Sequence, residues 1–251
     1  MNARMFPVPD RHKDKVYLVT GGAGGIGKAC AERFAAEGAQ VMIADIDPDG
    51  QAVAHAIGGT FRLVDMSQPD SVRDLARTTI ETFGRIDIWH NNAFSAVFKP
   101  IDQQTLEEFE RITAVGIRGY WIGAKVAVEH MIERGGKGVI INTASVQSFI
   151  GEKGFSAYQV TKGAVLALTR SLAVDHGPDI RAVAIAPGLI KTQAIAGIPD
   201  EIMTEVIAGI PAGRGAEPEE VAALAAFIAS EEADYMSGTA VILDGGYLAI
   251  G

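Results

Sequence analysis

The chain has 251 residues, 48% of them hydrophobic, and a formal net charge of −9 at pH 7. This length predicts one large α/β domain or two small ones around a sizeable core, and the acidic balance argues against nucleic acids and anionic membranes as partners. The single cysteine, Cys30, excludes an intrachain disulfide and fits a reducing compartment.

Three further classes of feature are not found in the sequence. The longest apolar run, Val221–Ala229, is far too short to span a membrane. The five histidines show no metal-ligand spacing with one another or with Cys30, so we expect no metal site. Residues 1–14 contain Pro7, Pro9 and several charges but no apolar segment typical of a secretory signal. We therefore expect a loose N-terminal arm over residues 1–14 and a cytoplasmic location.

Short apolar segments alternate with helical segments along the rest of the chain. The predicted strands are Val16–Thr20, Val41–Asp45, Phe61–Asp65, Ile86–Asn91, Val139–Thr143, Arg181–Ala186 and Ala240–Asp244. The predicted helices are Lys28–Glu37, Val53–Ile57, Ser67 to about Phe83, Asp102–Arg134, Ser156–His176 and Glu217–Ser230. Continuous apolar strands between helices indicate a parallel sheet covered on both faces. We therefore expect an α/β fold with a Rossmann-like, doubly wound sheet of about seven strands, forming a single domain over residues 15–251.

Polar residues follow most of the predicted strands. They are Thr20, Asp45, Asp65, Asn91, Ser145 and Pro187 with its neighbouring glycine. Ligands of doubly wound sheets bind beyond the carboxyl ends of the strands, so these residues should share one edge of the sheet.

A glycine-rich loop, Gly21-Gly22-Ala23-Gly24-Gly25-Ile26-Gly27, lies between the first strand and the first helix. Glycines there let backbone amides approach a pyrophosphate at the helix N-terminus. Asp45 comes eighteen residues after Gly27, near the usual distance for a carboxylate that binds the ribose 2′-hydroxyl. The same carboxylate would repel a 2′-phosphate, and neither Ile46 nor Asp47 would attract one. The pattern predicts NAD as cofactor, with the solvated strand end as the other interpretation of Asp45.

Ser145, Tyr158 and Lys162 form a candidate acid–base group. Tyr158 and Lys162 are four residues apart, so they share one face of a helix. A free tyrosine has a pKa of about 10, and a nearby cation lowers that value toward neutral pH. The Y-x-x-x-K spacing alone also occurs by chance on surface helices, so the interpretation depends on the cofactor site.

Taken together, these motifs resemble the short-chain dehydrogenase/reductase family, from about Lys15 to Gly246. The matching segments are T-G-G-A-G-G-I-G at 20–27, Asn91-Asn92-Ala93, Ser145 with Tyr158 and Lys162, P-G-L-I-K-T at 187–192, Arg214 with E-P-E-E-V at 217–221, and Asp244-Gly245-Gly246. The resemblance implies an oxidoreductase that interconverts a secondary alcohol and a ketone, with Tyr158 as general acid or base and Ser145 holding the substrate oxygen. Lys162 would lower the pKa of Tyr158 and hold the nicotinamide ribose.

The resemblance also implies the remaining cofactor contacts. Asp65 and Met66 would hold the adenine, and the P-G-L-I-K-T segment would receive the nicotinamide. The implied cofactor-binding residues are Gly21, Gly24, Gly25, Ile26, Gly27, Asp45, Ile46, Asp65, Met66, Asn92, Ala93, Tyr158, Lys162, Pro187, Gly188, Ile190 and Thr192.

Two positions depart from the family pattern. Phe94 stands where N-N-A-G has its glycine, and Gly116 stands where V-N-x-x-G has an asparagine that supports a proton relay. Gly116 favours an alternative, a cofactor-binding protein with weakened or lost catalysis, whereas the intact Ser145, Tyr158 and Lys162 favour the enzyme. Glycine inside a helix indicates a local demand, either a widened helical turn or close packing.

The substrate pocket and the assembly are less specified. The candidates for the substrate pocket are mainly apolar: Phe94, Val146, Gln147, Phe149, Phe155, Leu189 and Ile195. The alternative is that several of these side chains pack in the core. The family resemblance implies a homotetramer, with a homodimer as the alternative. Tyr120, Trp121, Val165 and Leu168 supply apolar surface beyond one core stripe, unless they pack within the monomer.

Overall fold

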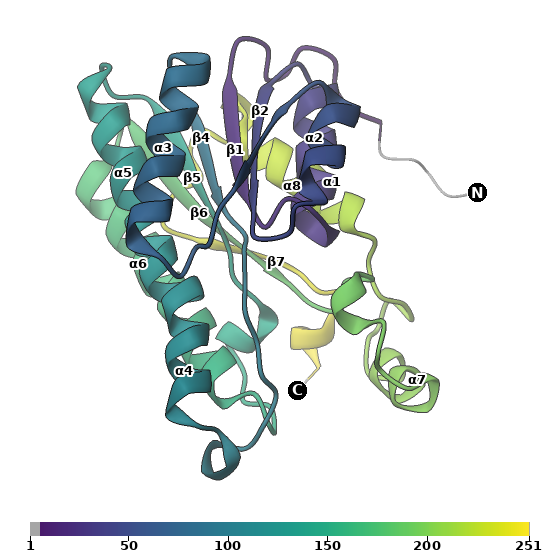
Figure 1. Ribbon diagram of the computed structural model, residues 1–251. Helices are drawn as coiled ribbons and strands as arrows, with labels where there is room; N and C mark the ends of the chain where they lie inside the picture. Colours follow the sequence, from purple (N-terminus) through teal and green to yellow (C-terminus); the bar gives the residue numbers. More distant parts are fainter. Residues whose placement is uncertain (1–5, 251) are drawn as a thin grey trace.

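A computed structural model describes residues 6–250 and shows one parallel sheet of seven strands in the order β3-β2-β1-β4-β5-β6-β7 (Figure 1). The strands are β1 Val16–Thr20, β2 Gln40–Asp45, β3 Thr60–Leu63, β4 Ile88–Asn91, β5 Gly138–Thr143, β6 Ile180–Pro187 and β7 Ala240–Leu243. The predicted fold class, a doubly wound Rossmann-like sheet of seven strands, is confirmed.

Helices cover both faces of this sheet. They are α1 Gly25–Ala36, α2 Gly50–Ile57, α3 Pro69–Phe83, α4 Leu106–Thr113, α5 Tyr120–Glu133, α6 Ser156–His176, α7 Asp200–Ala208 and α8 Pro218–Ala229. One core lies under α1 and α8, and a second lies under α3 and α5. Strand β1 supplies both, because Tyr17 and Val19 point to the first core and Leu18 points to the second. A sheet buried on both faces explains why its strands are continuously apolar.

The direction in which successive strands are added to the parallel sheet reverses between β1 and β4. This position is the topological switch point of the fold. The chain runs outward from β1 to β3 and then returns to pair β4 with the other side of β1. Ligands of such sheets bind in the crevice at this point, beyond the carboxyl ends of the strands. The glycine loop after β1 and the Asn91-Asn92 pair after β4 both lie there.

The structure differs from the expected elements in two places. Strand β3 ends at Leu63, so Asp65 lies in the following loop and not at the strand end. The predicted helix over Asp102–Arg134 is divided into α4 and α5 by a π-helix, Ala114–Gly119. Elsewhere the predicted strands and helices are observed, with boundaries shifted by up to three residues.

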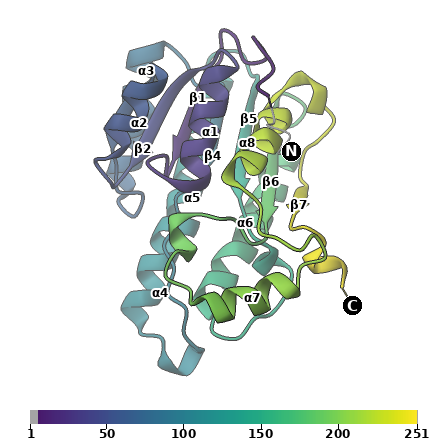
Figure 2. The ribbon, with the colours of Figure 1, turned by 90° about the vertical axis from the view of Figure 1, so that its right-hand side faces the viewer.

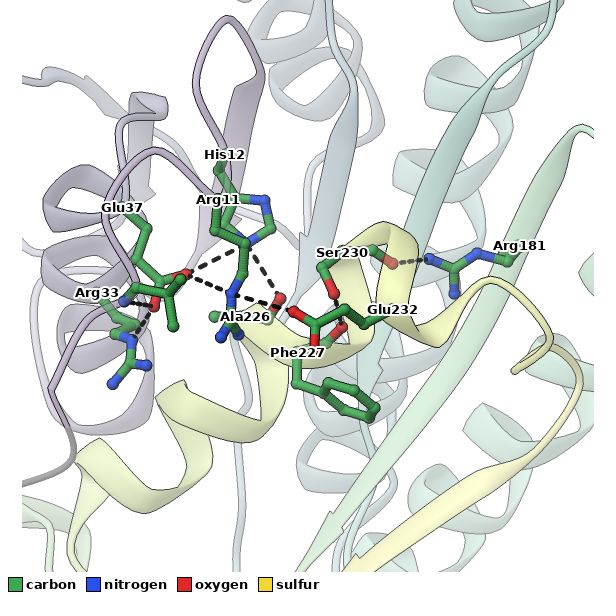
Figure 3. Close-up of polar contacts among 10 residues, drawn as sticks. Arg11, His12, Arg33, Glu37, Arg181, Ala226, Phe227, Ser230 and Glu232 are labelled. Carbon is green, nitrogen blue, oxygen red and sulfur yellow. Dashed lines mark hydrogen bonds and ion pairs between the residues drawn. The ribbon is translucent and has the colours of Figure 1, made fainter.

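Part of the segment that we expected to form an N-terminal arm, residues 1–14, contacts the domain; residues 1–5 lie outside the described part of the chain. His12 is buried, and its Nε2 lies 3.0 Å from the carbonyl oxygen of Ala226 on α8 (Figure 3). The His12 amide donates to the Glu37 carbonyl at 2.8 Å, beyond the end of α1. This segment therefore joins α1 to α8, because its polar groups find partners on both helices.

The Glu37 carboxylate is the centre of this contact. It is fully buried, its Oε1 accepts from Arg33 Nε at 2.5 Å, and its Oε2 lies 3.5 Å from Arg11 Nε and 3.6 Å from His12 Nε2. Oε1 also accepts from the amide of Val8 at 2.9 Å. A buried carboxylate requires this many partners, because its desolvation is unfavourable otherwise.

Arg181 on β6 stabilises the far end of α8. Its guanidinium donates to the carbonyl oxygen of Ser230 at 3.1 Å (Figure 3) and to that of Ile228 at 2.9 Å. These carbonyls lack partners within the helix, and a cation at the helix C-terminus is favourable. The C-terminal part of α8 is thus held by the sheet through Arg181 and by the N-terminal segment through His12.

We predict that Glu37→Gln lowers the free energy of unfolding by about 3 kcal/mol, because Arg11 and Arg33 lose their shared counter-charge. Glu32→Gln is the matched control, since its pair with Lys28 spans 3.9 Å at the surface. It should change stability by less than about 0.5 kcal/mol. Denaturant titration measures both, and equal effects would contradict the central role of Glu37.

Candidate active site

The glycine loop has the shape of a phosphate cradle. Its chain turns so tightly that a Cβ at Gly27 would overlap the carbonyl oxygen of Gly21, and Gly21 itself has a φ of +70°. At Gly24, by contrast, an added Cβ would meet nothing within 4 Å. The loop therefore combines close internal packing with bare backbone at the N-terminus of α1, which suits an anion such as a pyrophosphate.

Asp45 is held directly beside this loop. Its Oδ2 accepts from the amide of Ala23 at 2.8 Å, and its Oδ1 accepts from the amide of Asp47 at 3.0 Å. Ile46, next to it, is largely exposed. These residues fit a dinucleotide, because a fixed carboxylate at this position can accept hydrogen bonds from ribose hydroxyl groups while the loop binds phosphate.

Asp65 and Met66, which were expected to hold the adenine, lie in the loop after β3. This loop begins beside Asp45, whose carbonyl oxygen accepts from the Val64 amide at 2.7 Å. The Oδ1 of Asp65 accepts from the amide of Ser67 at 2.8 Å, and the Asp65 amide donates to Ser71 Oγ at 3.2 Å. Met66 is buried, and its carbonyl oxygen lies so close to Gly119 that a Cβ there would be 2.5 Å away. The loop after β3 is therefore supported by α3 and the π-helix.

Asn92 joins the switch point to the glycine loop. Its Nδ2 donates to the carbonyl oxygens of Thr20 at 3.0 Å and Gly21 at 3.2 Å. The amides of Asn92 and Ala93 donate to Thr20 Oγ1 at 3.0 and 3.2 Å. The preceding Asn91 is fully buried and donates to Asn142 Oδ1 at 2.9 Å, so it belongs to the core and not to the cofactor site.

The segment after β6 closes the far side of the loop. Gly188 approaches the backbone of Asp244 so closely that a Cβ would be 2.9 Å from its Cα. Thr192 reaches Gly25, where an added Cβ would lie 3.2 Å from the Thr192 Cγ2. Ile190 is buried, and its carbonyl accepts from the Thr192 amide at 2.9 Å. The structure thus brings Thr192 next to the glycine loop, although 165 or more residues separate them in sequence.

Ser145, Tyr158 and Lys162 lie together at the ends of β5 and α6. The buried Lys162 Nζ donates to the carbonyl oxygen of Thr143 at 2.7 Å and lies 5.6 Å from the centre of the Tyr158 ring. Ser145 lies close enough to Tyr158 that its side chain lowers the pKa of the tyrosine hydroxyl, against the effect of burial. Ser148 supports this corner, since its hydroxyl donates to the Lys162 carbonyl at 2.8 Å. The predicted group is therefore assembled as expected from the sequence.

The pKa values of these groups are set mainly by burial. Burial lowers the pKa of Lys162 to about 7, so the amine and the ammonium are both populated near neutral pH. Burial raises the pKa of Tyr158, and the side chain of Ser145 partly offsets this effect. Burial therefore outweighs the lowering that was expected from Lys162, whose Nζ lies 5.6 Å from the centre of the Tyr158 ring.

A second tyrosine borders the ammonium of Lys162. The ring of Tyr120 lies 5.7 Å from Nζ, so the ammonium lies near two aromatic faces. Tyr120 is fully buried, and its hydroxyl has no hydrogen-bond partner among the described residues. Tyr120 and Val165 therefore pack within the monomer, contrary to the expectation that both contribute surface for assembly.

Gly116 satisfies both of the demands anticipated from sequence. It lies in the π-helix Ala114–Gly119, so the helical turn is widened. It also packs directly against α6, since a Cβ at Gly116 would overlap Cγ2 of Thr161. An asparagine side chain cannot occupy this position without moving α6.

The structure brings only some of the predicted pocket residues close to the proposed site. Phe94 and Phe149 are exposed, and Leu189 packs against Gly215. The buried Gln147 donates its amide to Ser145 Oγ at 3.2 Å and its side-chain nitrogen to Glu152.

The remaining pocket residues show an aromatic group beside Tyr158. Val146 is buried, whereas Ile195 is partly exposed on the short helix after Thr192. Phe155 packs on Phe98 in a tilted arrangement, with ring centres 4.6 Å apart, and the ring centre of Phe98 lies 5.9 Å from that of Tyr158. Phe98 was missed because no motif marks it.

Other features of the described chain limit the chemistry. Within residues 6–250, no helix combines the length and apolar composition that a membrane crossing needs. The same residues contain no group of three or more histidine, cysteine or acidic side chains able to hold a metal ion. Cys30 is buried in the core, which raises the pKa of its thiol to about 12. It is a core residue and not a nucleophile.

Comparison with known proteins agrees with this geometry. A family model described as enoyl-(acyl carrier protein) reductase matches residues 21–248. A solved short-chain type dehydrogenase/reductase from Mycobacterium marinum is 34% identical, covers 94% of this chain and 96% of its own, and superposes with a TM-score of 0.88. The chain belongs to the short-chain dehydrogenase/reductase family.

Similar curated members of the family are dehydrogenases. Meso-2,3-butanediol dehydrogenase of Serratia marcescens is 39% identical, with 95% of this chain and 96% of that protein covered. NADP-dependent (R)-specific alcohol dehydrogenase of Lentilactobacillus kefiri is 36% identical, with 96% and 99% covered. 3beta-hydroxysteroid dehydrogenase 1 of Eggerthella lenta is 36% identical, with 94% and 95% covered. Their names state different alcohol substrates, and one of the three is named as NADP-dependent.

We predict that Gly116→Asn lowers turnover, because the side chain must displace Thr161. A graded test is Gly116→Ala, which should reduce the free energy of unfolding by about 1–3 kcal/mol through overpacking. Thr161→Ser removes the obstructing Cγ2 and keeps the hydroxyl that donates to Ala157 O at 2.8 Å. In that background Gly116→Ala should be neutral or stabilising. A Gly116→Asn enzyme with strongly raised turnover would show instead that an asparagine is missing from the relay.

Proposed function

We propose that this protein is an NAD-dependent oxidoreductase that interconverts a secondary alcohol and a ketone by hydride transfer. One observation carries the proposal: Ser145 and Tyr158, with Lys162 Nζ 5.6 Å from the centre of the tyrosine ring, lie at the same edge of the sheet as the glycine loop and Asp45. Similarity to butanediol, alcohol and hydroxysteroid dehydrogenases supports the reaction class.

The nicotinamide cofactor, when bound, accepts or supplies the hydride. The protein moves the proton: Tyr158 Oη donates a proton to the ketone oxygen in reduction and accepts the hydroxyl proton of the alcohol in oxidation. Ser145 Oγ holds the reacting oxygen and stabilises the charge that develops on it. Lys162, fixed by the Thr143 carbonyl, supplies positive charge near the phenol and binds the cofactor ribose. Thr192, beside the glycine loop, orients the nicotinamide.

The alternative function is a cofactor-binding protein with weakened or lost catalysis. Gly116 favours it, because the usual asparagine is replaced. The π-helix and the contact with Thr161 weaken that argument, since they show that this glycine meets a local packing demand. A dehydrogenase assay with NAD and a panel of secondary alcohols discriminates the two functions, because a binding protein would show affinity for NAD without turnover.

The preference for NAD rests on Asp45, since the relative from Lentilactobacillus kefiri is named as NADP-dependent. We expect NADP to bind at least about tenfold more weakly than NAD, because the fixed carboxylate repels a 2′-phosphate. Asp45→Ala should narrow this gap.

Asp47→Ala is the matched control, because it removes the same charge two residues away, where its Oδ1 accepts from the amide of Asp49. It should leave the preference unchanged. Equal dissociation constants of the wild-type protein for NAD and NADP, measured at one salt concentration, would refute the assignment.

We predict that Tyr158→Phe removes nearly all turnover while the dissociation constant for NAD changes by less than about twofold. The phenol carries the proton, whereas the ring only packs against Phe98 and Phe155. Because burial raises the pKa of Tyr158 above its ordinary value of about 10, the wild-type oxidation rate should still be rising with pH at about pH 10, as the small phenolate fraction grows. The reduction rate, which needs the protonated phenol, should begin to fall only above about pH 10.

Steady-state rates in both directions measure these effects. A Tyr158→Phe enzyme that keeps more than about a tenth of the wild-type turnover would show that another group transfers the proton.

We also propose a homotetramer, with a homodimer as the alternative, and a cytoplasmic location consistent with the single buried thiol of Cys30. Phe109, Ile117 and Trp121 line a shallow groove of about 930 Å³ along α4, the π-helix and α5. The side chain of Trp121 is more than half exposed and also borders a second groove with Leu168 of α6. A second copy of this chain would cover this apolar surface.

Trp121→Glu is expected to reduce the assembly to a smaller species, because it places a charge in the proposed interface. Leu63→Glu is the control, since Leu63 is equally exposed on the edge strand β3. Light scattering at micromolar concentration measures both masses. A monomeric wild-type protein would contradict the proposal.

A further inference from the structure

A chain of buried hydrogen bonds crosses the sheet beneath the proposed site. The hydroxyl of Tyr17 on β1 lies 2.7 Å from Nδ1 of His90 on β4. The Nε2 of His90 lies 2.9 Å from Thr143 Oγ1 on β5, and Thr143 Oγ1 lies 3.2 Å from Oδ1 of Asn92. The hydride-transfer mechanism above uses the backbone carbonyl of Thr143. It assigns no role to the Thr143 hydroxyl or to the side chains of Tyr17 and His90.

The partners of this chain decide which atom donates at each step. The Asn92 Nδ2 donates to two carbonyl oxygens, those of Thr20 and Gly21, so its Oδ1 faces Thr143 and accepts. The hydroxyl proton of Thr143 is therefore used toward Asn92, and Thr143 Oγ1 must accept from His90 Nε2–H. The other ring nitrogen, Nδ1, then accepts from the Tyr17 hydroxyl, provided that the ring is neutral.

The surroundings keep the imidazole neutral. His90 is fully buried, and burial together with the nearby positive charge of Lys162 lowers its pKa to about 3. A protonated ring would also lose the acceptor that the Tyr17 hydroxyl requires. The hydrogen bonds thus run in one direction, from Tyr17 through His90 and Thr143 to Asn92.

Asn92 connects this chain to the glycine loop. Besides its two hydrogen bonds, its amide packs against the start of α1, where a Cβ at Gly27 would lie 2.7 Å from Nδ2. Thr143 links the same chain to Lys162 through its carbonyl oxygen. Thr143 therefore contacts both parts of the site. Its hydroxyl donates to Asn92 beside the glycine loop, and its carbonyl oxygen accepts from Lys162.

We propose that His90 is a positioning residue that, as its Nε2–H tautomer, orients Thr143 and through it Asn92, and so holds the glycine loop in the shape that binds a dinucleotide. This inference rests on the dinucleotide cofactor of the proposed function, but not on the substrate or on turnover.

Tyr17→Phe tests the proposal without touching the cofactor site. The variant keeps the ring, which stacks on Phe34 at 3.7 Å, and removes only the hydroxyl that fixes Nδ1 as an acceptor. Without that donor, His90 gains access to the Nδ1–H tautomer, in which Nε2 accepts from Thr143 and Asn92 loses its donor. We expect the dissociation constants for NAD and NADH to rise about fivefold by calorimetry, the loss typical of one buried hydrogen bond.

Two further measurements separate positioning from a general loss of stability. Nitrogen-15 spectra of the wild-type protein should show His90 protonated at Nε2 and bare at Nδ1, and Tyr17→Phe should show a mixture of tautomers. Thr143→Val should also weaken cofactor binding, and the double variant should bind no more weakly than the worse single variant, because both changes break one chain.

Thr79→Val is the control, since it removes a buried hydroxyl that donates to Leu75 O at 2.7 Å within α3. It should lower stability and leave both dissociation constants unchanged. Wild-type affinity in Tyr17→Phe, additive effects in the double variant, or a wild-type His90 protonated at Nδ1 would each overturn the inference. A wild-type protein that binds neither NAD nor NADP would overturn it together with the proposed cofactor. A protein that binds NAD and oxidises no secondary alcohol would refute the proposed reaction alone.

Discussion

The ammonium of Lys162 is the buried charge around which the proposed site is arranged. Removing such a group from water is unfavourable, so its pKa falls to about 7 and each neighbouring dipole matters. The Thr143 carbonyl accepts from it at 2.7 Å, and the rings of Tyr120 and Tyr158 lie beside it. The same charge lowers the pKa of His90, which keeps that ring neutral and able to accept and donate at once.

Backbone contacts at glycine bring the elements close enough for this arrangement. Along the π-helix and α5, Gly116 packs on Thr161, Gly119 on the Met66 carbonyl and Gly123 on the ring of Trp89. These contacts hold α5 against the sheet and against α6, so that Tyr120 reaches Lys162 from one side while Tyr158 reaches it from the other. A larger residue at any of these positions would separate α5 from its neighbours.

The opposite end of the molecule has a second buried charge, and it is stabilised differently. Glu37 is surrounded by Arg11, Arg33 and His12, so its charge is paired. Among residues 6–250, by contrast, Lys162 contacts a carbonyl dipole and two aromatic rings but no counter-charge. The paired Glu37 carboxylate holds the N-terminal segment against α1, and His12 of that segment contacts Ala226 of α8, which lies beside α1 (Figure 2). An unpaired buried amine keeps a perturbed pKa, which is typical of a functional site.

The sequence by itself determined the doubly wound fold, the glycine loop with Asp45, and the grouping of Ser145 with Tyr158 and Lys162. These follow from local pattern: continuous apolar strands, glycines at a strand–helix turn, and a four-residue helical spacing. Even the widened turn at Gly116 was anticipated, because glycine within a helix is unfavourable unless the structure demands it.

Only the tertiary structure decided the long-range polar contacts. No spacing rule relates the residues that these contacts join. Examples are His12 with Ala226, the tilted ring pair of Phe98 and Phe155, and the hydrogen-bonded chain from Tyr17 to Asn92. The direction of the Tyr158 pKa shift also depended on the tertiary structure, because burial of the phenol raises its pKa. Sequence spacing predicts which residues share a helix face or a strand end, whereas desolvation and hydrogen-bond direction depend on every element packed around them.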